Sequence, residues 1–153
     1  AFPATHRFAE RESVSALELK NETMLLLGTG HCFRDHVLEV CPEFARYATN
    51  AEGIRRTFEG SSLETIKHMV AAGMGVTLVP RLAVPQDALS TVRRRRSDEP
   101  SVRYLPLVET EGAAPPSRRV VLVWRRSFTR YEAIAALRNA VYACNLPGVQ
   151  MLT

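Results

Sequence analysis

Cysteine, tryptophan and long apolar runs are all scarce in this chain. Its 153 residues include three cysteines and one tryptophan. So few cysteines cannot form the disulfide framework of a small secreted domain. We therefore expect a reducing compartment, in which any cysteine function is reactive rather than structural. No apolar run approaches the roughly 18 residues that span a membrane, and no secretory signal is visible, so we expect no membrane contact.

An excess of one charge is also missing, apart from one local run. The net charge of +4 equals the charge of the four consecutive arginines 93–96, and the remaining 16 basic residues balance 16 acidic ones. A nucleic-acid-binding domain usually spreads Lys and Arg over one face. We interpret the run as a solvated loop, with a phosphate or partner contact as the alternative.

Strand-like and helix-like patterns alternate along the chain. Capping boxes predict helices beginning at Ser15, Ser61 and Thr129. Short apolar runs predict strands at 24–27, from 58, and at 76–79, 102–107 and 120–124. This alternation predicts an α/β fold with a mainly parallel sheet covered by helices. Cys144 continues the apolar face of the last helix, so we expect a buried, inert thiol there.

The thiol Cys32 follows a glycine-containing turn and opens a predicted helix. That helix should end near residue 40, because Pro42 cannot lie in a helix interior. The positive end of the helix dipole and the nearby Arg34 are features that lower a thiol pKa. The sequence therefore predicts thiolate character at Cys32, which is the form that attacks a peroxide or a disulfide.

The second thiol of the segment, Cys41, is nine residues further on. On one helix, nine residues span roughly 13 Å along the axis, whereas a disulfide needs Cα atoms roughly 4.4 to 6.8 Å apart. Either the two cysteines never bond, or bonding unwinds the helix and acts as a redox switch. A zinc site formed by both cysteines with His31 and His36 is a further alternative, although close ligand pairs of the usual spacing are missing.

Several segments resemble a known family. Residues 30–35, Gly-His-Cys-Phe-Arg-Asp, followed by Cys41, are similar to the sensing segment of the OxyR group, the peroxide-responsive members of the LysR-type transcriptional regulators. Residues 62–80 resemble the helix, glycine turn and strand of LysR-type effector domains in general. Further matching stretches are 6–12, 118–119 and 130–132.

The resemblance implies a fold and a division of the chain. The fold would be a periplasmic-binding-protein-like effector domain. Residues 1–106 would form mainly effector subdomain II, and residues 107–153 the C-terminal part of subdomain I. The N-terminal DNA-binding domain and the beginning of subdomain I would be absent, and the opening Ala1 in place of an initiator Met also suggests a fragment. The stretch 41–58 is longer than in the enterobacterial pattern.

The resemblance also implies roles for individual residues. Cys32 would be the peroxidatic thiol and Cys41 the resolving thiol. Ligand-binding residues that line or support the peroxide pocket would be His31, Arg34 and Asp35, with Arg119 positioning the active loop. Hydrogen peroxide would oxidise Cys32, and a disulfide with Cys41 would then switch DNA binding and transcription of antioxidant genes.

The same resemblance implies partners and a location. Promoter DNA would be bound only through the absent N-terminal domain, and RNA polymerase would be a partner of the full-length protein. The regulatory domains would form a homodimer, and the full-length protein a tetramer in the bacterial cytoplasm, associated with the nucleoid. Neither a cofactor nor a metal nor an enzymatic activity is implied. Two alternatives remain, an effector domain that binds a small organic inducer with non-sensing cysteines, and a thiol peroxidase.

Overall fold

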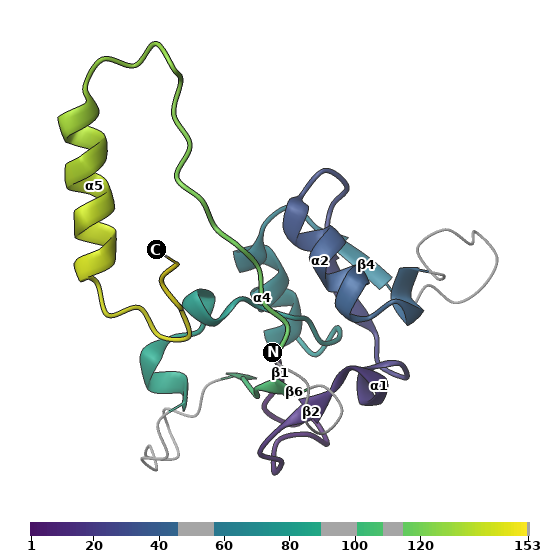
Figure 1. Ribbon diagram of the computed structural model, residues 1–153. Coiled ribbons are helices and arrows are strands. Elements are labelled where there is room, and N and C mark those ends of the chain that lie inside the picture. Colours follow the sequence, from purple (N-terminus) through teal and green to yellow (C-terminus); the bar gives the residue numbers. More distant parts are fainter. Residues whose placement is uncertain (46–56, 90–100, 109–114, 153) are drawn as a thin grey trace.

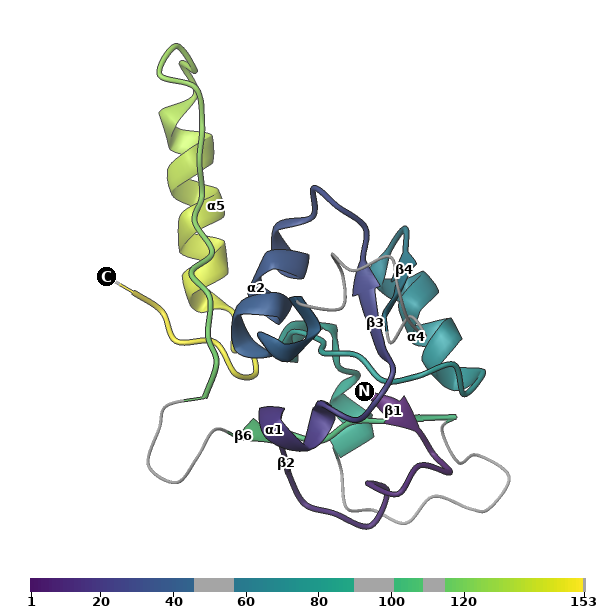
Figure 2. The same cartoon turned by 90° about the vertical axis from the view of Figure 1, so that its right-hand side faces the viewer.

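The computed structural model describes residues 1–45, 57–89, 101–108 and 115–152 (Figure 1). The arginine run 93–96 and residues 46–56, which make up most of the stretch 41–58, lie outside these residues. The elements form a mixed α/β body, from which a C-terminal extension projects (Figures 1 and 2). In the described segments, no helix is long and apolar enough to cross a membrane.

Strand β3 (Met24–Leu27) lies at the centre of the body, and all four of its residues are buried. It pairs in parallel with β4 (Thr57–Gly60), with Met24 opposite Thr57 and Leu27 opposite Gly60. Successive side chains of a strand point to opposite faces. Met24 and Leu26 accordingly belong to one hydrophobic cluster and Leu25 and Leu27 to the other. The predicted strand buried on both faces is confirmed.

Two helices cover the two faces of β3. On one face lies α2 (Cys32–Val40), which contributes Val37 to the first cluster. On the other lies α4 (Leu63–Ala71), which contributes Ile66 and Val70 to the second. Both helices contact β3. The short helix α1 (Ala16–Leu19) leads into this arrangement.

The expected strand at 76–79 forms a single parallel bridge between Val76 and Met24. Val76 donates to the oxygen of Thr23 at 2.9 Å, but the next backbone amide, that of Thr77, donates to the oxygen of Ala1 at 3.0 Å. The backbone ladder with β3 therefore ends after one residue, because Ala1 takes both backbone hydrogen bonds of Thr77, whose hydroxyl alone still reaches β3 by donating to the Leu25 oxygen at 2.7 Å. The prediction of a regular strand over 76–79 is therefore wrong.

Two further strand pairs complete the body. Strand β1 (Phe2–Pro3) pairs antiparallel with β5 (Val102–Arg103), and β2 (Val14–Ser15) pairs in parallel with β6 (Leu107–Val108). The single strand predicted over 102–107 is therefore divided in two. Pro106 lies at the division and has no N–H to donate, which makes it unsuited to a continuous ladder.

The helix starts are only partly as predicted. Glu18 Oε2 accepts a hydrogen bond from the Ser15 amide at 2.9 Å, as the first capping box requires. For α4, however, the N-cap is Ser62 rather than Ser61, and for α5 (Tyr131–Ala143) it is Arg130 rather than Thr129. At α4 the two neighbouring serines give the same sequence signal, so the predicted cap was one residue out. At α5 the N-cap Arg130 makes no side-chain capping bond, so the predicted capping box of Thr129 is not formed.

Ser62 provides a direct test of this cap. Its Oγ accepts from the Thr65 amide at 3.1 Å, a bond that satisfies one of the free amides of the helix start. Ser62→Ala should lower the free energy of unfolding by about 1 kcal/mol. Ser61→Ala should change it by less than about 0.5 kcal/mol, since surface substitutions away from such features are nearly neutral. Urea unfolding of the two variants measures both values, and equal losses would contradict the assignment.

The C-terminal extension, residues 115–152, projects from the body (Figures 1 and 2). It meets the body near its two ends, where Arg118 lies over the Phe33 ring and Gly148 lies against the Arg81 side chain. Residues 120–124 form no regular strand, and Val120 and Val123 are 77% and 79% exposed. No residue of α5 is buried, and Cys144 at its C-cap is exposed. The predictions of a strand at 120–124 and of a buried Cys144 are therefore wrong. Periodicity identifies an apolar face, but among the described residues this face meets the extended segment 119–124 only across an open hollow.

Candidate functional site

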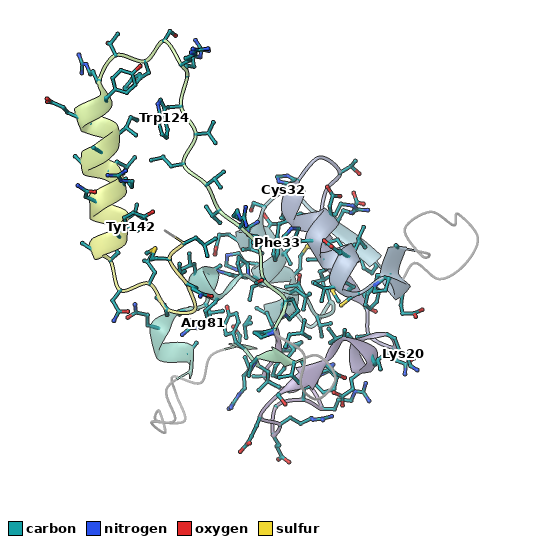
Figure 3. All side chains as sticks on the ribbon, in the orientation of Figure 1. Lys20, Cys32, Phe33, Arg81, Trp124 and Tyr142 are labelled. Carbon is teal, nitrogen blue, oxygen red and sulfur yellow. The ribbon has the colours of Figure 1, made fainter. Side chains whose placement is uncertain are left out.

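The site is built where β3 turns into α2. Gly30 has a φ of +95°, a conformation that glycine adopts without steric cost. His31 is the N-cap, and Cys32 is the first residue of α2. The predicted turn and helix start are thus confirmed. His31, Cys32 and Asp35 are all exposed, and Figure 3 shows Cys32 at the end of α2 that points away from the body.

Arg34 turns into the protein instead of towards solvent. Its side chain is only 11% exposed. Nη1 donates to the backbone oxygen of Leu27 at 2.9 Å and lies 2.7 Å from Oε1 of Glu59 on β4. The guanidinium thus ties the first turn of α2 to the ends of both central strands. Sequence reasoning missed Glu59, because nothing in its spacing links it to Arg34.

A second contact reaches this turn from the extension. The guanidinium of Arg118 lies 5.3 Å from the ring centre of Phe33, the residue after Cys32, within the range of a cation–π interaction. Arg119, to which the resemblance assigns the positioning of the active loop, lines a hollow of about 720 Å³ with Trp124 and Tyr142. Figure 3 shows Trp124 directed from the extended segment towards α5. Arg118 is therefore the arginine of this pair that contacts α2.

Cys41 lies at the opposite end of α2. It is the C-cap residue, and its amide donates to the oxygen of Val37 at 2.9 Å. The side chain is 2% exposed and belongs to the same cluster as Phe44. Burial raises the pKa of the Cys41 thiol to about 11. The group is therefore a protonated, core-packed thiol at neutral pH.

The two thiols are free, one exposed and one buried. An intact α2 separates them by roughly 13 Å along its axis, about twice the Cα separation that a disulfide allows. A bond between them would need the helix to unwind, as the spacing predicts. Among the described residues, no three His, Cys, Asp or Glu side chains group to hold a metal ion. The zinc alternative therefore finds no support in the described part of the chain.

The raised pKa of Cys41 predicts a loss of stability in alkali. The unfolded thiol, with its ordinary pKa of 9.0, ionises before the folded thiol does. Ionisation of Cys41 should leave the free energy of unfolding unchanged below about pH 9. By about pH 11 it should have lowered that free energy by about 2 kcal/mol. In urea unfolding across this range, the parent protein should lose about 2 kcal/mol more than Cys41→Ala.

Other groups cancel in that comparison. The pKa of Tyr104 is also raised by burial, but Tyr104 is present in both proteins. The difference between the two pH profiles therefore isolates Cys41. Parallel profiles for the two proteins would contradict a buried thiol at this position.

Comparison with known proteins identifies the fold. The model of the LysR substrate binding domain matches residues 1–143. The chain belongs to this family. The expected fold class, a periplasmic-binding-protein-like α/β effector domain, is confirmed. LysR substrate-binding domains are parts of transcriptional regulators and do not form an enzyme class.

Similar proteins place this LysR domain near one group of regulators. It is 38% identical over 133 residues to the DNA-binding transcriptional dual regulator OxyR of Escherichia coli K12, and 37% identical to a hydrogen peroxide-inducible genes activator of Dickeya chrysanthemi. Each match covers 85% of this chain and 37% of the relative, so the chain spans little more than a third of these relatives.

Solved structures agree with this placement. A reduced form of OxyR from N. meningitidis matches with a TM-score of 0.76 and 34% identity, over 99% of this chain and 63% of that one. The reduced OxyR regulatory domain of Pseudomonas aeruginosa matches with a TM-score of 0.64 and 36% identity, over 94% and 59%. The resemblance to the OxyR group predicted from residues 30–41 is confirmed.

Proposed function

We propose that this LysR domain senses hydrogen peroxide for a transcriptional regulator through Cys32 and Cys41. The observation that carries the proposal is the placement of the thiols. Cys32 is exposed at the start of α2, and Cys41 is held in the core at its end. The similarity to proteins named hydrogen peroxide-inducible genes activators supports the same function.

The proposed chemistry proceeds in two steps. The Cys32 thiolate attacks one oxygen of hydrogen peroxide, the O–O bond breaks, and the products are a sulfenic acid and, after protonation, water. The Cys41 sulfur then attacks the Cys32 sulfur, a disulfide forms, and the sulfenic oxygen leaves as a second water. Each peroxide thus oxidises two thiols by two electrons, and a cellular thiol reductant would reverse the change.

Other residues have supporting roles in this proposal. The exposed His31 and Asp35 flank Cys32 and would contact peroxide. Arg34 would hold the first turn of α2 through its bonds to Leu27 and Glu59. Arg119, which lines the hollow of the extension, would help to position the active loop.

The wider biological proposal follows the relatives. Residues 1–106 would form mainly effector subdomain II and residues 107–153 part of subdomain I. The full-length regulator would bind promoter DNA through a separate domain, contact RNA polymerase, and assemble as a tetramer from dimers of this domain in the bacterial cytoplasm, on the nucleoid. The disulfide would change that assembly and activate antioxidant genes.

The test is oxidation of the full-length protein by stoichiometric peroxide. Free thiols are alkylated after a short exposure, and the linked peptides are identified by mass spectrometry. We expect a Cys32–Cys41 bond, with the exposed Cys144 still free. Both thiols remaining free in a modest excess of peroxide would refute the proposal.

A second candidate is an effector domain that binds a small organic inducer. The match to the LysR substrate binding domain favours this candidate. The binding of an inducer would, however, make no use of the arrangement of Cys32 and Cys41. Thermal stabilisation of the full-length protein by a metabolite, together with no response to peroxide, would support this candidate over the peroxide sensor.

A further inference from the structure

We propose that Glu59 is a positioning residue that sets the redox potential of the Cys32–Cys41 pair through Arg34. This inference rests on the proposed function, since it concerns the balance between the dithiol and disulfide forms of the same site. It assigns a role to a residue that neither the sequence nor the comparisons single out.

Arg34 is held by partners that lie outside α2. This residue is the third of α2 and lies between the two cysteines in the chain. Its side chain is nevertheless fixed outside the helix, 2.9 Å from the Leu27 oxygen and 2.7 Å from Glu59 Oε1. Leu27 offers an uncharged oxygen. Glu59 therefore supplies the opposite charge for this nearly buried guanidinium.

Glu59 is itself fixed by the sheet. It lies on β4, opposite Leu26 in the parallel ladder, and so is carried by the backbone pairing of the two central strands. A Cβ placed on Gly28 would lie 4.0 Å from Glu59 Oε2, which puts the carboxylate beside the turn into α2. The ion pair thus fastens the first turn of the helix to a strand outside the 32–41 segment.

Disulfide formation would disturb this fastening. The backbone between residues 32 and 41 must rearrange before the two sulfurs can meet, and Arg34 is part of that backbone. The ion pair therefore belongs to the dithiol form. Removal of the Glu59 charge leaves the Arg34 guanidinium, which is only 11% exposed, without an opposite charge, and this costs free energy in that form alone.

The redox consequence has a definite sign. Oxidation of the dithiol releases two electrons and two protons, which a cyclic disulfide such as oxidised dithiothreitol accepts. Stabilisation of the dithiol raises the reduction potential of the couple. Loss of the Glu59 charge should therefore make the disulfide easier to form and harder to reduce.

The experiment is a redox titration of the full-length protein in dithiothreitol buffers of graded ratio, with the Cys32–Cys41 bond quantified after acid quenching. Glu59→Gln should raise the equilibrium constant for disulfide formation five- to tenfold, which moves the midpoint by about 20–30 mV to more negative values. Glu59→Asp keeps the charge, so its midpoint should lie closer to that of the parent protein.

The matched control is Glu64→Gln. Glu64 pairs with Lys67 at 2.8 Å on α4, away from the cysteines, so its loss should leave the midpoint unchanged. High salt should also move the parent midpoint towards that of Glu59→Gln, because the half-exposed carboxylate is screened.

Two results would overturn the inference, and they are distinguishable. If the parent protein forms the disulfide but Glu59→Gln titrates within twofold of it, Glu59 does not act on the couple, while the proposed function stands. If the parent protein forms no Cys32–Cys41 bond in oxidised dithiothreitol or peroxide, the proposed function fails as well.

Discussion

Replacement of Cys32 by serine should reduce peroxide-dependent transcription to the uninduced level. The thiolate is the form that attacks peroxide, and a serine hydroxyl is not ionised at neutral pH and cannot form a sulfenic acid. Cys32 is exposed at the first turn of α2, so the substitution should leave the fold intact. A reporter gene driven by the full-length regulator measures the response.

Cys144→Ser is the matched control for this experiment. Cys144 is also an exposed, free thiol, but it lies at the end of α5. The control should respond to peroxide like the parent protein. Loss of the response in Cys144→Ser, or its retention in Cys32→Ser, would show that the wrong thiol has been assigned.

Replacement of Cys41 by alanine should separate the two chemical steps. Cys32 should still be oxidised. The sulfenic acid should persist, because residues 32–41 then contain no second thiol that can attack it. With excess peroxide it should proceed to sulfinic acid. A sulfenic-acid-specific probe and intact-protein mass measure both products, and Cys144→Ala is the control.

Folding of this variant must be followed in parallel. Cys41 is packed beside Phe44 and Val37 with 2% exposure, and loss of its sulfur should cost roughly 1–2 kcal/mol of stability. Rapid disappearance of the sulfenic acid without over-oxidation would mean that another thiol resolves it, which contradicts the role of Cys41.

The sequence was sufficient for β3, α2 and the position of Cys32. Four consecutive apolar residues predicted β3, and the glycine turn and Pro42 predicted the limits of α2. These signals are local, because each depends on a few neighbouring residues. The single strand predicted over 102–107 failed since two different partners, β1 and β2, each take a part of it.

The residues missed at the site share one property. Glu59 contacts Arg34 from a strand 25 positions later in the chain, and Arg118 reaches Phe33 from the extension. Such contacts depend on the way distant segments pack, which periodicity does not encode. The exposure of Val120, Val123 and Cys144 was missed for the related reason that burial depends on what covers an apolar face.

The burial of Cys41 has a consequence for the rate law of the proposed sensor. Oxidation of the exposed Cys32 is second order and accelerates with peroxide concentration. Disulfide closure must wait for α2 to open and release Cys41 from the core, and this opening is unimolecular, with local openings taking microseconds to seconds. Closure should therefore reach a plateau rate at high peroxide. At high peroxide concentrations, the opening rate of the nine-residue helix α2 would then set the response time, and the peroxide concentration would not.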